Sequence, residues 1–299
     1  MKLICIVALA ALAFAHPISQ SMTDKINAGA TWTAMTPEEN PFSYMTEEEI
    51  VAIMGTRLTV EEEIPSKLDY NADDLPTNFN AQVEEADCFQ EIRDQAACGS
   101  CWAFGATEAL AQRFCKQTGE KVVLSPEDMV ECDKFNLGCQ GGILGFAWGY
   151  LEKHGVVTEE CYHYHSEKGE TEACHTTCEN EADFATDKHF SVSKSKVHPK
   201  TYDDIRAEIF YNGAVEAGFT VFEDFMAYKT GIYEHTTGKQ LGGHAVMLTG
   251  FGEDDSGRNY FIASNSWGAK WGEEGQFRIY ADQCGIDGQI YAGEPQQHE

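Results

Sequence analysis

Two cysteines in the stretch QAACGSCWAF, Cys98 and Cys101, lie three residues apart where an apolar run begins. Such a C-x-x-C pair can be a thioredoxin-like redox pair, half of a zinc site, or one structural cysteine beside one nucleophile. A redox pair should follow a buried strand, but residues 91–95 (EIRDQ) are too polar for one. A zinc site needs a second pair, and Cys174 with Cys178 is the nearest, although an oxidising compartment disfavours it. The pattern therefore favours a structural cysteine beside a nucleophile.

A nucleophilic cysteine makes further demands on the chain. Its thiol pKa must be lowered by a helix N-terminus or a neighbouring imidazolium, and Cys101 opens a segment with helical periodicity. A histidine must take up the proton, and His244 in GGHAV follows two glycines that allow close backbone approach. A third side chain must orient that histidine, and Asn265 in NSWG follows the next expected strand. His244 and Asn265 lie 143 and 164 residues after Cys101.

The elements that must position these side chains fall into two parts. Helical patterns cover 101–117, the segment after Ser125-Pro126, and 143–154, each with a capping or stop signal. Strand patterns cover 245–251, 259–264 and 276–280. One more helix, at 202–212, precedes them, with Thr201 as its cap. This order predicts an α+β fold, with a helical half at about 85–185, a β half at about 186–293 and a cleft between them.

Charge and cysteine content narrow the classes of function. The 299 residues carry a formal net charge of −28, which makes nucleic acid and anionic membranes poor partners. Beyond residue 15 no apolar run approaches the length of a bilayer span, so we expect no membrane insertion. Ten of the eleven cysteines lie in that region and fit an oxidising compartment. Their number alone allows five disulfides, or four disulfides and two free thiols.

The N-terminal part divides into two segments. Residues 1–15 join Lys2 to an apolar run that ends in AFA, as in a signal peptide cleaved before His16. Residues 16–74 contain no cysteine and show no strand-like alternation, while Thr46 and Glu49 form a capping box for a short helix. Residues 61–74 are typical of an extended acidic linker. We therefore expect a propeptide at 16–74 and the mature protein at 75–299.

The stretch CGSCW, with His244 and Asn265 downstream, resembles the papain family of cysteine proteases. GCQGG at 138–142, TGIY at 230–233 and NSWGAKWGEEGQFRI at 265–279 resemble family segments in the same order. EIRDQ, GGHAV, CGIDGQIYAG and the short propeptide resemble cathepsin B-like enzymes in particular. The resemblance implies a papain-like fold, with a helical left domain, a β-barrel-like right domain and the active site in the cleft between them.

The resemblance also implies a role for each site residue. Cys101 would be the nucleophile, His244 its proton partner and Asn265 the residue that orients the imidazole, while Gln95 would donate to the oxyanion. Substrate would bind along Gly141 and Gly142, beneath Trp267, and against Gln289 in the pocket for the second side chain before the scissile bond. The implied disulfides are Cys88–Cys115, Cys98–Cys139, Cys132–Cys174 and Cys161–Cys178, with Cys284 left as a free thiol. Neither a metal nor a cofactor is implied.

The implied activity is that of a cysteine endopeptidase, made as a zymogen in the secretory pathway and directed to a lysosome-like vacuole or secreted. Its partners would be protein and peptide substrates, its own propeptide and cystatin-like inhibitors. Cathepsin B carries an occluding loop with a His-His pair, but the segment from Cys161 to Cys178 is too short to contain it. We therefore expect an open cleft, with His163 and His165 at the surface or the cleft rim. The alternative is a catalytically inactive papain-like binding module, which the intact triad disfavours.

Overall fold

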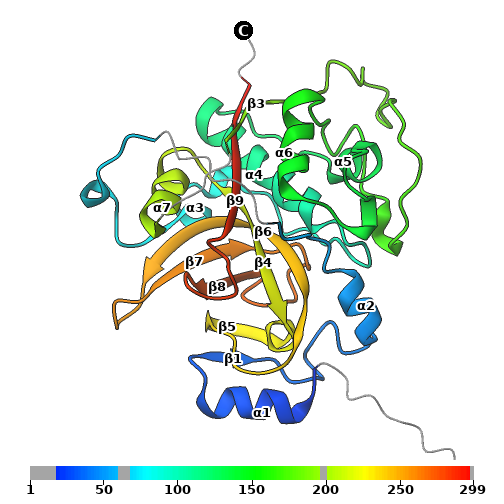
Figure 1. The fold of residues 1–299 in the computed structure, drawn as a ribbon. Coiled ribbons are helices and arrows are strands. Elements are labelled where there is room, and N and C mark those ends of the chain that lie inside the picture. The colour runs from blue at the N-terminus through cyan, green and yellow to red at the C-terminus, as the bar shows by residue number, and fades with distance from the viewer. Residues whose placement is uncertain (1–17, 60–67, 196–200, 297–299) are drawn as a thin grey trace, which may run out of the picture.

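The computed structural model describes residues 18–59, 68–195 and 201–296, so the expected signal peptide and the first part of the acidic linker lie outside the described residues. Figure 1 shows α4, α5 and α6 on one side of a large sheet, with α1 and β1 at its opposite end. The helices are α1 (Gln20–Gly29), α2 (Glu47–Ala52), α3 (Ala81–Glu84), α4 (Cys101–Thr118), α5 (Pro126–Cys132), α6 (Leu144–Lys153) and α7 (Tyr202–Tyr211). The strands are β1 (Trp32–Ala34), β2 (Phe79–Asn80), β3 (Ser191–Ser195), β4 (Val215–Phe222), β5 (Tyr228–Tyr233), β6 (Gln240–Glu253), β7 (Asn259–Ser264), β8 (Gln276–Tyr280) and β9 (Gln289–Pro295). The predicted α+β fold is confirmed.

The predicted capping residues begin three of these helices. The Ser125 hydroxyl accepts a hydrogen bond from the Asp128 backbone N–H at the start of α5. Thr201 begins α7 in the same way, and Thr46 forms the predicted capping box at the start of α2. These caps satisfy backbone N–H groups that the first helical turn leaves without a partner. The caps therefore define where the helices start, as the sequence indicates.

Helix α4 is the central helix of the fold. Its residues 101–115 are all buried, and Figure 1 places it between the sheet and the outer helices. Alanines such as Ala103, Ala106 and Ala109 favour the helix and let its backbone approach its neighbours closely. The helix ends at Gly119, whose φ of 79° permits the left-handed turn in which its N–H bonds to the Cys115 carbonyl. Its N-terminus, at Cys101, lies where the helices meet the sheet.

The sheet brings the second part of the expected site together. Its strand order is β1-β5-β8-β7-β6-β4-β9-β3, with β2 also paired to β6. The pairs are antiparallel except for β5 with β8, which is parallel. Strand β6 pairs with β7, and Met247 lies opposite Ser264. This pairing brings His244, in β6, close to Asn265, which directly follows β7.

Residues 16–74 contribute a strand that the sequence pattern did not show. Trp32 and Thr33 in β1 pair with Gly231 and Thr230 in β5, and the Trp32 indole N–H donates to the Glu234 carbonyl at 2.9 Å. Three residues are too few to display an alternating pattern, so a sequence reading cannot detect such a strand. The segment adds to the sheet edge and shares the apolar core of the β half, to which Ile26 and Ile50 belong.

One fully buried arginine ties the two halves of the fold together. The Arg113 side chain in α4 pairs with Glu208 in α7 at 2.6 Å and donates to the Ala214 carbonyl at 2.7 Å. Arg113 also lies 3.7 Å from the more exposed Glu294, but Glu208 is buried and depends on Arg113 for compensation of its charge.

Within the described ranges, no helix is both long and apolar enough to cross a bilayer.

We expect Arg113→Met to lower the free energy of unfolding by about 3–5 kcal/mol, because it leaves the Glu208 carboxylate buried without its partner. Urea unfolding of the disulfide-intact chain measures this change. Lys121→Met is the matched control: its pair with Asp87 is exposed, so its loss should cost less than about 1 kcal/mol. Equal stabilities of the two variants would contradict the structural importance of the buried pair.

Candidate active site

The Cys101 thiol lies at the first residue of α4 and is completely buried. A helix N-terminus carries partial positive charge, which favours a thiolate at this position. The backbone N–H groups of Gly55 and Ala245 bond to the thiol, and the Thr56 hydroxyl lies 3.2 Å from the sulfur. Because Ala245 follows His244 in β6, this contact places the thiol next to the expected proton partner.

The imidazole of His244 is oriented by one hydrogen bond and one ring. Its Nε2 lies 2.8 Å from Asn265 Oδ1, an acceptor, so Nε2 donates. The other nitrogen, Nδ1, is buried and makes no hydrogen bond to a described residue, which leaves it available as a proton acceptor. The Trp267 ring stacks on the imidazole with 4.6 Å between centroids. Trp267 therefore covers one face of the imidazole.

Burial acts against the charged forms of both titrating groups. Removal from water raises the pKa of the Cys101 thiol, although the hydrogen bond with Thr56 opposes this shift. Burial lowers the pKa of His244 to about 4, and the hydrogen bond with Asn265 opposes it only in part. The cover thus disfavours an ion pair between the thiol and the imidazole.

Gln95, the expected oxyanion donor, is buried and held from several sides. Its Oε1 accepts a hydrogen bond of 2.7 Å from the Ser266 hydroxyl, and its Nε2 donates to the Cys98 carbonyl at 2.8 Å. The same Nε2 also donates to the Ile53 carbonyl at 3.0 Å. The amide is thus aimed at a carbonyl oxygen of the covering segment. Sequence reasoning missed Ser266, because it lies 171 residues from Gln95.

Residues 53–59 cross the site and cover the thiol. The Gly142 N–H donates to the Gly55 carbonyl at 2.8 Å, and the Thr56 N–H donates to the Gly243 carbonyl at 3.0 Å. A Cβ on Gly141 would lie 2.5 Å from the Gly55 oxygen, and one on Gly243 would lie 2.2 Å from the Thr56 oxygen. Gly141 also has a φ of 102°, which side chains rarely adopt. Glycine is therefore needed where an extended chain lies against the cleft.

Gln289 begins β9 and faces the covering segment. It pairs with Gly218 of β4, and its Nε2 donates to the Thr59 carbonyl at 2.5 Å. The space above Gly218 is shared by the Leu58 and Leu144 side chains and by Gln289. The structure thus places an apolar side chain beside Gln289, and Asp287 two residues earlier is exposed.

His163 and His165 bind the same carboxylate. His163 Nδ1 and His165 Nε2 lie 2.9 Å and 2.7 Å from the two oxygens of Glu179, and all three side chains are substantially exposed. The bond to Glu179 raises the pKa of His165. Both histidines are at the surface, within the short loop closed by the Cys161–Cys178 disulfide.

The structure joins the same four pairs of cysteines that the resemblance implied and leaves Cys101 and Cys284 free. Burial raises the pKa of the Cys284 thiol to about 12, which makes it a poor nucleophile. Among the described residues, the side chains that cluster closely enough for a metal ion are Cys161, Cys178 and Asp187. Those two sulfurs are bonded to each other, so they are not available as thiolate ligands.

Comparisons with known proteins agree with this geometry. The family model for papain family cysteine proteases matches residues 75–293. Cathepsin B of Dictyostelium discoideum is 44% identical over an alignment of 237 positions, which covers 74% of this chain and 75% of that protein. A gut-specific cysteine proteinase of Caenorhabditis elegans is 35% identical over an alignment of 333 positions including gaps, which covers 98% of this chain and 99% of that protein. The structure of proCathepsin B S9 from Trypanosoma congolense matches with a TM-score of 0.86 and 28% identity, over 95% of this chain and 100% of that one.

We expect the cover over the site to open more readily as the pH falls. The pKa of covered His244 is about 4 against an ordinary 6.5, so any form that exposes this imidazole binds protons more strongly. The covered form should be most stable above pH 6.5 and lose stability as the pH falls toward 4. Hydrogen exchange of residues 53–59 in the full-length Cys101→Ser chain, corrected for intrinsic rates, should therefore be faster at about pH 4.5 than at pH 7.

His244→Asn is the matched control for this pH effect. It should remove most of the change in hydrogen exchange between pH 6.5 and 4.5.

A second contribution to the stability of the covered form should be lost only at lower pH. Lys229 lowers the pKa of Glu39, which lies in the same N-terminal region as the cover, so that pair is lost only as the pH falls below 4.5. Equal exchange at pH 7 and pH 4.5 in the Cys101→Ser chain would contradict a role for His244 protonation in opening the cover.

Proposed function

Because this chain belongs to the papain family of cysteine proteases, with cathepsin B-like relatives, we propose that it is a cysteine endopeptidase made as an inhibited zymogen. One observation supports the proposal: residues 53–56 contact both the Gln95 amide and the Cys101 thiol, and the thiol also bonds to the backbone of Ala245, the residue after His244. Cystatin-like inhibitors, which bind proteases of this family, are proposed as further partners.

In the proposed mechanism, His244 Nδ1 takes the proton from Cys101, and the sulfur attacks the carbonyl carbon of the scissile peptide bond. The negative charge moves to the carbonyl oxygen, where the Gln95 Nε2–H and the Cys101 backbone N–H stabilise it. His244 then gives its proton to the leaving amine, the C–N bond breaks and a thioester remains. Water, deprotonated by His244, hydrolyses the thioester and restores the thiol.

Residues 16–74 would inhibit the enzyme by covering this machinery without presenting a bond to it. The Ile53 carbonyl occupies the Gln95 donor, whereas the Thr56 hydroxyl lies at the thiol. Two residues separate these positions, so different parts of the segment occupy the oxyanion donor and the nucleophile. This arrangement supports a propeptide that binds in the cleft and excludes a substrate from it.

The proposed location is the secretory pathway, with delivery to a lysosome-like vacuole or release from the cell. Cathepsin B-like relatives and a procathepsin neighbour support such a route. Four disulfides also fit an oxidising compartment.

Cleavage of internal bonds is proposed because the Cys161–Cys178 loop is short. His163 and His165 bind Glu179 beside this loop. With no longer insertion there, both ends of the cleft would remain open, and a substrate chain could extend past the site in both directions.

The test is hydrolysis of internally quenched peptides by the full chain after proteolytic removal of residues 16–74. We expect activity to appear when residues 16–74 are removed, with products from cleavage of internal bonds. Cys101→Ala or His244→Ala should reduce kcat/KM by about 10⁴-fold or more.

An epoxide inhibitor should label Cys101. The Cys284→Ala variant should be labelled, and should hydrolyse the peptides, as the parent protein does. Labelling without turnover would favour the inactive binding module. Full activity with residues 16–74 retained, or stepwise removal of C-terminal dipeptides alone, would contradict inhibition by the propeptide or an open cleft.

Gln289 should make the neighbouring pocket prefer apolar side chains over arginine. A neutral amide can accept a hydrogen bond from a guanidinium, but a charge-assisted bond is roughly twice as strong, so arginine should lose on the order of 1 kcal/mol. Substrates that differ only in Val or Arg at the second residue before the scissile bond measure this preference. Gln289→Glu should raise turnover of the Arg substrate several-fold, mainly where the carboxylate is ionised. Asp287→Asn, at an exposed position, should change the turnover of neither substrate. Equal turnover of the Arg and Val substrates by the parent protein would contradict the assignment of Gln289 to this pocket.

A further inference from the structure

We propose that Tyr164 is a positioning residue for the oxyanion site, because its hydroxyl braces the loop that separates Gln95 from Cys101. The inference deepens the proposed function, since it concerns the two hydrogen-bond donors that this function assigns to the developing oxyanion. Tyr164 lies outside that machinery, in the short loop closed by the Cys161–Cys178 disulfide.

The Tyr164 hydroxyl touches both ends of the loop 95–100. It donates to the Gln95 backbone carbonyl at 2.9 Å and lies 2.8 Å from the Ser100 hydroxyl. Gln95 carries one proposed oxyanion donor, and Ser100 is the residue directly before Cys101, whose backbone N–H is the other. One oxygen atom thus connects the residues on which both donors depend.

Proton counting defines the direction of these bonds. The Gln95 carbonyl can only accept, so the single phenolic proton of Tyr164 goes to it. Ser100 must then donate its hydroxyl proton to the Tyr164 oxygen. Ser100 is the first flanking residue of α4, but its hydroxyl makes no capping bond to the helix. The Ser100 side chain therefore holds the loop to Tyr164 and does not cap the helix, which is the usual role of a serine at this position.

The loop that Tyr164 braces has a strained backbone. Ala96 has a φ of 52°, in the left-handed region that residues with a Cβ rarely adopt. On its outer side Gln95 is held by Ser266, through the side-chain bond and a 2.9 Å bond from its N–H to the Ser266 carbonyl. Within the loop, Cys98 bonds to Gln95 through its N–H and through its carbonyl. Tyr164 adds the contact that reaches Ser100, the residue before α4, and so helps to set the distance between the two oxyanion donors.

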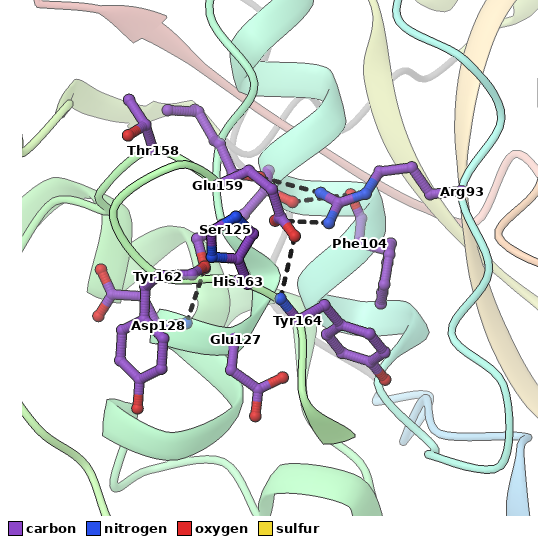
Figure 2. Close-up of polar contacts among 12 residues, drawn as sticks. Arg93, Phe104, Ser125, Glu127, Asp128, Thr158, Glu159, Tyr162, His163 and Tyr164 are labelled. Atoms are coloured by element: carbon purple, nitrogen blue, oxygen red, sulfur yellow. Dashed lines mark hydrogen bonds and ion pairs between the residues drawn. The ribbon is translucent and has the colours of Figure 1, made fainter. Parts of the chain in front are cut away.

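Tyr164 is itself held firmly, as Figure 2 shows. Its ring packs edge-to-face on Phe104 of α4, with 4.9 Å between centroids. Its backbone N–H donates to Glu159 at 3.0 Å, and Glu159 pairs with Arg93 at 2.5 Å. The Arg93 guanidinium lies 5.0 Å from the centre of the same Phe104 ring. Burial raises the pKa of the Tyr164 phenol, so the hydroxyl remains protonated and can donate at any pH at which the enzyme would work.

Tyr164→Phe tests the inference, because it removes the hydroxyl and keeps the ring on Phe104. In protein activated by removal of residues 16–74 we expect kcat, per titrated active site, to fall about tenfold, less than the 10²–10³ for loss of a whole oxyanion donor. KM should stay within about twofold. The rate at which iodoacetamide alkylates Cys101, and its pH profile, should not change, since alkylation needs the thiolate but forms no oxyanion.

Tyr162→Phe is the matched control. Tyr162 lies in the same loop and is fully buried, but its hydroxyl has no hydrogen-bond partner among the described residues. Its removal should leave kcat as in the parent. If Tyr164 acts through Gln95, Tyr164→Phe should cost almost nothing more in a Gln95→Ala background.

Three results would overturn the inference: an unchanged kcat in Tyr164→Phe, an alkylation rate that falls in parallel with kcat, or independent effects of Tyr164→Phe and Gln95→Ala. Parallel losses would mean that the hydroxyl supports the thiol or the fold as a whole. The parent protein separates this outcome from failure of the proposed function. A parent without peptidase activity overturns the function itself, whereas an active parent with an equally active Tyr164→Phe overturns only the positioning role.

Discussion

The contact between the first turn of α4 and the middle of β6 is the constraint on which the rest of the structure depends. It places the Cys101 thiol against the backbone N–H of Ala245 and so beside His244. A helix supplies the nucleophile with a favourable dipole, and a strand supplies an imidazole whose direction the sheet determines. The pairing of β6 with β7 then places Asn265 against that imidazole. No local segment could satisfy these requirements alone, because thiol and imidazole come from different halves of the fold.

Burial of this contact is what would keep the proposed active site inhibited. With residues 53–59 in place, water is excluded, and the neutral forms of Cys101 and His244 are favoured. Net charge cannot hold this cover, since residues 16–74 have twelve acidic and three basic side chains on an acidic protein. Backbone bonds to Gly142 and Gly243, the strand pair β1–β5 and a shared apolar core hold it instead. Exposed pairs such as Glu39 with Lys229 add little individually.

The disulfide-closed segment from Cys161 to Cys178 connects the protein surface with the loop before α4. Its outer side chains, His163 and His165, meet Glu179 at the surface. Its inner side chain, Tyr164, reaches the loop between Gln95 and Cys101. Because successive residues in an extended segment point in opposite directions, one short stretch can expose two histidines and also brace the loop beneath it.

Residue types and their order alone indicated the proposed chemistry and most of the elements. Cys101 at a helix start, His244 behind two glycines and Asn265 after the next strand could be recognised from residue types and order, and the caps at Ser125 and Thr201 located helices. These signals are local, so they survive without coordinates. Only the tertiary structure showed the three-residue strand β1, the Ser266 bond that orients Gln95, and the Tyr164 hydroxyl. Each joins residues far apart in the chain by hydrogen bonds or packing, and such contacts leave no periodic or spacing signal in either partner.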